Sequence, residues 1–223
     1  IGHLDHEFQS MMETIKGQLH RVFRTQNSVT FPISGPGSVG MEACFVNLIE
    51  PSDTVIVCQN GVFGGRMKEN VERCGGTVVA VNDEMGKPVD PDKLRAALKA
   101  HPNAKAVAFV HAETSTGVAS DAATLCKIAR DAGTLTIMDT VTSLAGIAVE
   151  IDAWGADATY SGTQKCISCP PGLSPVTFSP RAIEAVKART TKVQRWFLTL
   201  NLVLAYWDGD GGRSAPGPLY TSA

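Results

Sequence analysis

The sequence predicts an α/β protein of three layers, in which helices cover both faces of a mostly parallel sheet. Strand-like apolar runs alternate with helical segments about every 20–25 residues, as in repeated strand–helix–strand units. The chain has 223 residues and is 43% hydrophobic, so it can bury a large core as one domain. Only 6% of its residues are aromatic, while Ala, Val and Gly are abundant, which suits closely packed α/β layers.

The first expected helix covers residues 5–24. Apolar side chains that include Met12 and Leu19 recur there at helical spacing, and Asp5 stands where it could cap the first turn. A methionine-rich stripe of this kind indicates packing against the core of the protein.

A strand, a glycine-rich turn and a helix follow in that order. The run 29–33 is strand-like, and the helix is expected from Ser38 to Ile49. Pro51 marks the end of this helix, because proline cannot continue the backbone hydrogen bonds. The next β-branched run, at 54–58, predicts a second strand.

The middle of the chain repeats this alternation. A helix is expected over 67–74, where two glycines close it, and a strand is expected over 77–81. Asp90 then begins a helix that runs to Ala100, and the apolar run 104–110 predicts a buried strand.

The last third of the chain adds further strands and helices. A helix over 121–132 precedes a strand over 135–138, and a short β-type run at 157–159 predicts another strand. A rigid turn lies at Pro170–Gly172, and an apolar stretch of mixed helical spacing covers 196–207. No internal repeat or low-complexity segment interrupts this order.

Composition argues against several kinds of partner. The net charge is −2 and the charges are interspersed, so no basic stripe exists for nucleic acid. No apolar run reaches membrane-spanning length, and the first residues lack a signal-peptide pattern. The six cysteines stand mostly in apolar segments and are interpreted as reduced core residues of an intracellular protein. We expect a cytoplasmic protein, with an organelle such as the peroxisome as the alternative compartment.

Three glycines form a possible anion-binding turn. Gly35, Gly37 and Gly40 match G-x-G-x-x-G between a strand and a helix, where backbone N–H groups and the positive helix end can approach a phosphate. A dinucleotide site would also need an acid at the end of the next strand, but Gln59-Asn60-Gly61 stands there. The turn is therefore interpreted as a site for a single phosphate, or as a turn that is merely tight.

Two further residues bring reactive chemistry to the predicted sheet edge. Asp139 follows the strand at 135–138, and a carboxylate buried there is costly unless it meets a cation or hydrogen-bond donors. Lys165 follows the strand at 157–159 within Tyr160–Cys166, and a lysine in a semi-buried cleft there could lose its proton and form an imine. With the glycine turn, these are the parts that pyridoxal phosphate (PLP) requires. The alternatives are an exposed loop lysine and an aspartate that only caps a turn.

Six ordered motifs resemble those of the class V aminotransferases, and among them the alanine–glyoxylate and serine–pyruvate aminotransferases. Their number and order make the resemblance specific, and it extends from Gly2 to about Trp207. It implies the large domain of the fold-type I PLP-dependent transferases. The motifs are Ile33–Gly37 with Met41–Ala43, Glu50-Pro51, Asn60–Gly64, His111–Gly117, Met138–Leu144, and Tyr160–Lys165 with Pro170–Gly172.

The resemblance implies a role for each matching residue. Lys165 would be the Schiff-base lysine that moves the substrate proton, and Asp139 would pair with the pyridinium nitrogen of PLP. Gly37 and Ser38 would donate backbone N–H groups to the phosphate, with Gln164 assisting.

Three more roles come from the resemblance alone. Phe63 stands where the family places an aromatic ring stacked on the cofactor, often a tryptophan. Thr114 stands where the family has a hydroxyl near the phenolic oxygen of PLP, and Val141 would pack on the other face of the ring.

The resemblance also implies a division of the chain. Residues 1–24 would be an N-terminal helix, 25–185 the PLP-binding large domain, and 186–223 a helical connector and divergent tail. The small C-terminal domain, which carries the arginine for the substrate carboxylate, would be absent. Gly211–Pro218 stands where the family has an aromatic-His-His-Thr segment that reaches the partner subunit's phosphate. We therefore expect a fragment or truncated gene product.

The expected reaction is transamination of a small amino acid, alanine or serine, with glyoxylate or pyruvate. The expected partners are these amino acid and 2-oxo acid substrates and a second copy of the chain in a homodimer, with no nucleic acid and no membrane. Alternatives are an inactive cofactor-binding homologue, a nucleotide-binding α/β module, and a cysteine desulfurase, a class that typically has His where Gln164 stands. Cys166 and Cys169 form a C-x-x-C pair, but no second pair at ligand spacing supports a metal site.

Overall fold

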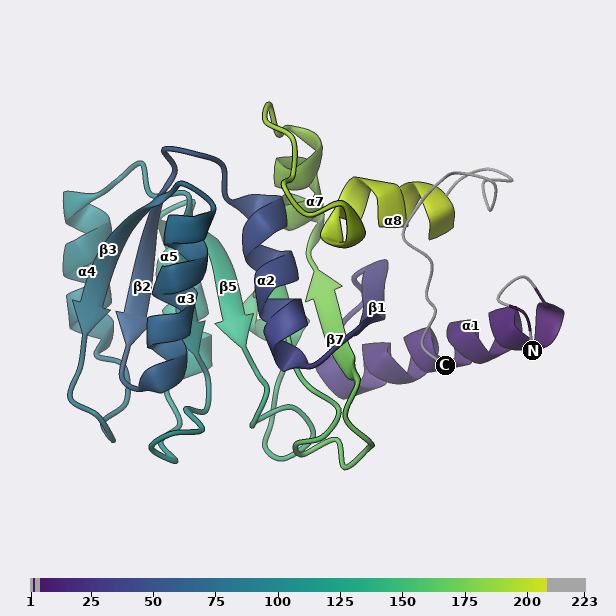
Figure 1. Ribbon diagram of the computed structural model, residues 1–223. Coiled ribbons are helices and arrows are strands. Elements are labelled where there is room, and N and C mark those ends of the chain that lie inside the picture. Colours follow the sequence, from purple (N-terminus) through teal and green to yellow (C-terminus); the bar gives the residue numbers. More distant parts are fainter. Residues whose placement is uncertain (1, 3–4, 208–223) are drawn as a thin grey trace.

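The computed structural model describes residues 2 and 5–207 and contains one sheet of seven strands between two layers of helices (Figure 1). The strands are β1 (Val29–Ser34), β2 (Thr54–Gln59), β3 (Thr77–Asn82), β4 (Ala106–Val110), β5 (Leu135–Asp139), β6 (Ala158–Tyr160) and β7 (Leu173–Phe178). The helices are α1 (His6–Phe23), α2 (Gly37–Leu48), α3 (Val62–Arg73), α4 (Pro91–Ala100), α5 (Ala122–Asp131), α6 (Ile151–Trp154), α7 (Pro180–Lys187) and α8 (Leu200–Trp207), with a 3₁₀ turn η1 at Trp196–Leu198. The expected three-layer α/β fold is confirmed.

The strand order is β1-β7-β6-β5-β4-β2-β3. Strands β6, β5, β4, β2 and β3 pair in parallel, and β7 is antiparallel to both β6 and β1. The alternation of apolar runs did not predict β7. Its direction agrees with the connection after β6, because a parallel return usually needs a crossover helix and residues 161–172 contain none. Here the chain reverses through Pro170–Gly172, where Gly172 has φ of 128°.

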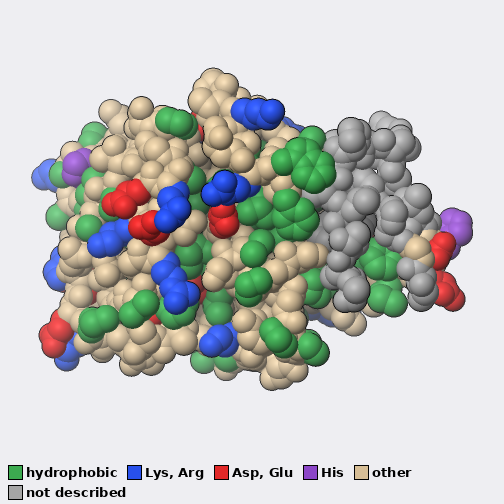
Figure 2. Space-filling model, viewed as in Figure 1, with side chains coloured by type: hydrophobic (Ala, Val, Ile, Leu, Met, Phe, Trp, Pro, Cys, Tyr) green, Lys and Arg blue, Asp and Glu red, His purple; other side chains and the backbone are tan. Residues whose placement is uncertain are grey.

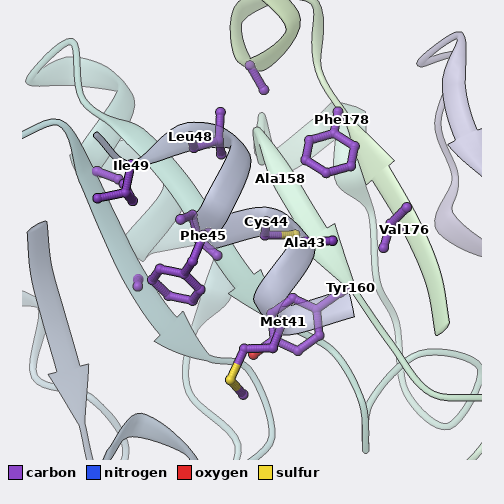
Figure 3. Packing of buried hydrophobic residues seen from close by; sticks show 14 of the residues in the cluster. Met41, Ala43, Cys44, Phe45, Leu48, Ile49, Ala158, Tyr160, Val176 and Phe178 are labelled. Carbon is purple, nitrogen blue, oxygen red and sulfur yellow. The ribbon is translucent and has the colours of Figure 1, made fainter. Parts of the chain in front are cut away.

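Two apolar clusters fill the space between the sheet and its helices. Side chains of α2, α3, α7 and α8 join the cluster on one face, and side chains of α1, α4, α5 and α6 join the cluster on the other. Neighbouring residues of β5 divide between them, since Ile137 belongs to the first cluster and Met138 to the second. Figure 3 shows the first cluster, with Phe45 of α2 and Tyr160 of β6 in the layer between helix and sheet.

The starts of the helices agree with the predicted caps in part. Asp90 accepts a hydrogen bond from the first turn of α4, as an N-cap residue does. Asp121, which the sequence placed as the first residue of a helix, is instead the N-cap of α5 and accepts from its first turn. Asp5 occupies the N-cap position of α1, but its carboxylate accepts from the Gly2 N–H at 2.6 Å and not from the helix. Helix α3 begins at Val62, five residues before the predicted start, because a distant side chain satisfies its first turn.

Each glycine of the G-x-G-x-x-G motif meets a different constraint. Gly35 has φ of 132°, which other residues rarely adopt. A Cβ on Gly37 would lie 3.0 Å from a methyl of Val141, so the start of α2 lies against the segment after β5. A Cβ on Gly40 would overlap the Ser174 hydroxyl and lie 3.0 Å from the Cβ of Tyr160, so α2 packs directly on β6 and β7. The motif thus brings a helix start close to two strand ends.

The cysteines differ in exposure more than the sequence suggested. Cys44, Cys58 and Cys126 are buried, as expected of reduced core residues, but Cys166 and Cys169 are exposed on the loop after β6. The expectation was wrong for this pair because the loop extends past the ends of the strands, where apolar neighbours in the sequence do not imply burial.

We expect Cys166 and Cys169 to react rapidly with an aromatic disulfide reagent in the native protein. Cys44, Cys58 and Cys126 should react only on unfolding, because burial excludes the reagent and raises their pKa, that of Cys58 to about 12. A stopped-flow thiol titration measures both phases, and the double replacement of Cys166 and Cys169 by serine should remove the fast one. A fast phase that survives this change would contradict the assignment.

The last described segment supports the predicted helical stretch. Leu198, Leu200 and Val203 are buried, whereas Trp196 and Phe197 are 61% and 41% exposed. The predicted tail at Gly211–Pro218 lies outside the described residues. Among the helices of the described part, none combines the length and the apolar character needed to cross a bilayer.

Candidate active site

The predicted site residues lie at the carboxyl ends of strands or in the segments that follow those ends. Strand β7 is antiparallel to both β1 and β6, so β1 runs in the same direction as the parallel strands. The loops after these strands therefore meet at one edge of the sheet, the usual ligand-binding edge of α/β proteins. The residues are Gly37 and Ser38 after β1, Phe63 after β2, Thr114 after β4, Asp139 and Val141 at the end of β5, and Gln164 and Lys165 after β6.

Asp139 is a buried acid at this edge, with 2% of its surface exposed. The Val141 N–H donates to its Oδ1 and the Tyr160 hydroxyl to its Oδ2, both at 2.8 Å. Burial raises the pKa of Asp139 to about 6 and the nearby Glu113 acts in the same direction, while the two hydrogen bonds and the more distant Arg66 oppose the rise. Within residues 5–207, no lysine or arginine forms an ion pair with Asp139.

This arrangement fits a cationic ligand atom. A buried carboxylate that meets only neutral donors loses hydration without gaining an opposite charge, which disfavours its ionised form. A protonated ring nitrogen placed against Asp139 would supply that charge. The residues present therefore suit the pyridinium nitrogen of PLP.

The start of α2 forms an anion-binding cradle. The N–H groups of a first helical turn have no partners within the helix, and Pro36 at the N-cap position provides no side-chain cap. Gly162 lies against Gly37, since a Cβ on Gly162 would be 3.5 Å from the Gly37 Cα and 2.9 Å from the Oε1 of Gln164. The Gln164 side chain thus lies beside the helix start, and together these donors fit a phosphate group.

Val141 connects the acid to the cradle. Its N–H bonds Asp139 and its side chain contacts the Gly37 position, while only 9% of its surface is exposed. An apolar side chain between a carboxylate and an anion-binding turn is suited to pack on a flat aromatic ring.

Thr142 links the loop after β4 to the loop that carries the predicted lysine. The Thr114 hydroxyl donates to the Thr142 hydroxyl at 3.4 Å, and the latter donates to the Ala112 carbonyl at 2.6 Å. The Cys166 thiol donates to the Thr142 carbonyl at 3.4 Å. Lys165 stands next to that cysteine, so its backbone is held beside the segment after Asp139.

Lys165 is exposed, so of the two interpretations left open by the sequence the exposed loop lysine, and not the semi-buried one, describes this structure. Its carbonyl accepts from the Ser168 N–H at 2.9 Å and its own N–H donates to the Gly162 carbonyl at 3.3 Å, which closes a tight turn. Within the described residues, this turn projects past the strand ends and no segment covers it. The turn fixes the backbone of Lys165 while leaving its side chain exposed.

Phe63 is half-buried in the first turn of α3. The guanidinium carbon of Arg66 lies 4.5 Å from the centre of its ring, in cation–π geometry. One face of the ring therefore already contacts a cation, and the predicted stacking of a cofactor on Phe63 stays a prediction.

Glu113 was missed by sequence reasoning. It is 1% exposed, and its carboxylate accepts from the Phe63 N–H at 3.2 Å and from the Ser115 N–H at 3.0 Å. It thus caps α3 from the loop after β4 and explains the early start of that helix. Gly61 permits this contact, because a Cβ there would overlap the Glu113 side chain. Glu113 lies in a recognisable motif, but its partner is 50 residues away.

His111 is a core residue and does not fit a catalytic base. Its ring packs edge-on against Trp154, with centroids 5.2 Å apart, and burial lowers its pKa. Among the described residues its Nδ1 has no hydrogen-bond partner.

The family model described as Aminotransferase class-V matches residues 1–194. The chain belongs to the class V aminotransferase family. Its sheet and helices are those of the fold-type I PLP enzymes, as the resemblance of the motifs implied.

Three relatives show how this class V aminotransferase chain compares with known proteins. The soluble hydrogenase 42 kDa subunit of Anabaena cylindrica is 40% identical over 204 residues, which are 90% of this chain and 52% of that protein. The (S)-ureidoglycine–glyoxylate transaminase of Bacillus subtilis is 36% identical over 200 residues, which are 89% of this chain and 47% of that protein. The crystal structure of alanine–glyoxylate aminotransferase from Nostoc sp. has a TM-score of 0.91 and 41% identity, and covers 99% of this chain and 59% of its own. The chain spans about half the length of the curated relatives it matches.

Proposed function

We propose that this class V aminotransferase chain binds PLP and serves the transamination of a small amino acid, alanine or serine, with glyoxylate or pyruvate. The observation that carries the proposal is the buried Asp139 carboxylate, which lacks a cation and lies at the same sheet edge as the uncapped start of α2. The names of two relatives, a ureidoglycine–glyoxylate and an alanine–glyoxylate aminotransferase, favour glyoxylate as the amino acceptor.

Five residues of the chain would bind the cofactor and move the substrate proton. Asp139 would hold a positive charge on the ring nitrogen, while the N–H groups of Gly37 and Ser38 and the amide of Gln164 would bind the phosphate. Lys165 would hold the cofactor covalently and carry the substrate's α-proton. When bound, PLP supplies an electron-withdrawing ring that stabilises the charge left by that proton.

Three side chains would orient the ring. Val141 would pack on one face and Phe63 on the other, and the Thr114 hydroxyl would lie near the phenolic oxygen. Thr114 is exposed and bonded to Thr142, so its hydroxyl is already held at the edge where the ring would lie. The homodimer expected from the resemblance stays a prediction, which sedimentation velocity of the purified chain tests.

Covalent labelling tests the proposal directly. The purified chain is incubated with PLP, reduced with borohydride and digested, and the modified lysine is located by mass spectrometry. We expect the label on Lys165 and a visible absorbance band before reduction. Lys165→Arg should abolish both, while Lys127→Arg, which changes an exposed lysine paired with Asp131, should change neither. Label spread evenly over surface lysines would contradict the proposal.

Addition of amino acids to the PLP-loaded chain separates the alternatives. L-Alanine or L-serine should convert the visible band to the shorter-wavelength band of the aminated cofactor, with release of pyruvate or hydroxypyruvate. A band that does not respond would indicate a cofactor-binding but inactive homologue. Formation of alanine from L-cysteine, with the sulfur recovered as sulfide once a thiol reductant is added, would instead indicate a desulfurase.

A further inference from the structure

Tyr160 is a buried side chain in the motif around Lys165 to which the roles above assign no function. It is the last residue of β6 and pairs in register with Asp139, the last residue of the parallel strand β5. Neighbours in register point to the same face of a sheet, here the face that α2 covers (Figure 3). The Tyr160 hydroxyl is therefore placed beside the Asp139 carboxylate, and it donates to Oδ2 at 2.8 Å.

We propose that Tyr160 is the positioning residue that holds the Asp139 carboxylate in place and as an anion for a cationic group bound at this edge. The identity of that group as a ring nitrogen rests on the proposed function. The hydrogen bond from Tyr160 and its effect on the pKa of Asp139 do not depend on the proposed function.

Tyr160 can fix a neighbour because its own position is fixed. None of its surface is exposed, and its Cβ lies against the Gly40 position of α2. Its carbonyl accepts from both the N–H and the hydroxyl of Thr140, at 2.9 and 2.8 Å, so strand and side chain are held from two sides. Because the ring is held in this way, the position of its hydroxyl is fixed, and the hydroxyl points toward the Asp139 carboxylate.

Few groups around Asp139 favour the ionised form of its carboxylate. Arg66 on α3 is the one cation that acts on Asp139 among the described residues, and it lies over the Phe63 ring. Glu113, after β4, is a like charge that opposes ionisation of Asp139. The Cys44 thiol on α2 also faces the pair, but burial raises its pKa and keeps it neutral. The donors that remain are the Val141 N–H and the Tyr160 hydroxyl.

Tyr160 stays a donor throughout the useful pH range. Burial and the neighbouring Asp139 raise its pKa well above the ordinary value for tyrosine, so the hydroxyl keeps its proton. Val141 donates through its backbone, which no side-chain substitution removes. Tyr160 is thus the one of the two donors that a mutation can delete.

Tyr160→Phe removes the hydroxyl and keeps the ring. In the cofactor-free full chain with ¹³C-carboxyl-labelled aspartate, NMR titration should show the pKa of Asp139 raised by about one to two units, because a hydrogen bond to the charged form is lost. The Asp139 signal is assigned by its absence in Asp139→Asn. Thr159→Val is the matched control, since Thr159 is a buried neighbour on β6 whose hydroxyl has no hydrogen-bond partner among the described residues. It should leave the Asp139 titration unchanged.

A second readout follows binding of PLP. Tyr160→Phe should weaken PLP affinity by up to about tenfold near neutral pH, and the loss should diminish at higher pH, where Asp139 ionises in both proteins. A residue with only a packing role would lower the melting temperature without this pH dependence. An Asp139 titration that is the same in Tyr160→Phe and wild type overturns the proposal.

The outcomes separate the two proposals. If Tyr160→Phe raises the pKa of Asp139 and the wild-type chain fails to bind PLP, the positioning role stands and the proposed function fails. If PLP labels Lys165 but Tyr160→Phe leaves the pKa of Asp139 unchanged, the proposed function stands and the positioning role fails. Should Tyr160→Phe not fold, ¹⁹F NMR of wild type containing 3-fluorotyrosine replaces it: the Tyr160 signal should move as Asp139 titrates, and a signal that stays constant overturns the proposal.

Discussion

Asp139→Asn should stabilise the cofactor-free protein increasingly as pH rises, while it reduces the proposed transaminase activity by about 100-fold or more, the scale for a preorganised charge. The pKa of Asp139 in the folded protein is about 6, above the ordinary 3.8. A carboxyl group whose pKa is raised by folding contributes stability fully below the unfolded pKa and loses it as pH rises through the folded pKa. The wild-type protein therefore loses on the order of 3 kcal/mol between about pH 4 and pH 8 through this group.

Asparagine is neutral throughout this pH range, so the variant loses no stability through ionisation at this position. Its amide can still accept from Tyr160, but its NH₂ group would face the Val141 N–H, which offsets part of the gain equally at every pH. The measurement is therefore the difference in the free energy of unfolding between variant and wild type, from urea titrations across the pH range. A difference that stays constant with pH would show that folding does not raise the pKa of Asp139.

Asp157→Asn is the contrasting substitution. Asp157 is equally buried, but it accepts from the Ser179 hydroxyl at 2.7 Å and pairs with Arg181 at 3.3 Å. Its replacement should destabilise the protein by about 2 kcal/mol, because it leaves these partners without a charge. The same change of residue thus has opposite expected effects at a structural acid and at a candidate functional one.

Gly40→Ala should destabilise the protein by about 1–3 kcal/mol or more, the usual range for overpacking a core. The added methyl would overlap the Ser174 hydroxyl and press on Tyr160, so α2 must move away from β6 and β7. The start of α2 carries Gly37 and Ser38, and we therefore expect weaker PLP binding as well. Urea unfolding and a fluorescence titration with PLP measure the two effects.

Gly17→Ala is the matched control for that change. Gly17 also lies inside a helix, α1, but no atom lies within 4 Å of its added Cβ. There the higher helix propensity of alanine should stabilise the protein by about 0.5–1 kcal/mol. If both substitutions changed stability by the same amount, close packing at Gly40 would not be the reason for its glycine.

The groove beside Ser38 shows what charge counts alone could not predict. It lies between α2, α3 and the segment after α7, and lysine, arginine and acidic side chains gather on this face (Figure 2). The balanced net charge argued against a basic stripe, but more basic than acidic side chains line this groove, and only some of them form pairs such as Arg195–Glu42. Which charges would face one another across a groove depends on the packing of helices that are distant in the sequence.

Local patterns in the sequence predicted most of the elements and the edge at which the site lies. Asp139 proved to be the last residue of β5, one position earlier than predicted relative to the strand end, and Lys165 lies in the loop after β6 as predicted, because β-branched runs end where polar residues begin. The glycines at the start of α2 were recognised because the turn and the helix start are local features. By contrast, β7 and its direction and the cap of α3 by Glu113 were not predicted, and the sequence left the exposure of Lys165 open.

The sequence by itself determined the layered α/β class, the strand ends that carry the candidate site and the family, since these depend on period, turns and ordered motifs. Only the tertiary structure decided that Tyr160 donates to Asp139, that α2 packs directly on β6 and β7, and that the Lys165 turn is exposed. The physical reason is that these contacts depend on strand register and helix docking. Both are settled when residues distant in the chain pack together.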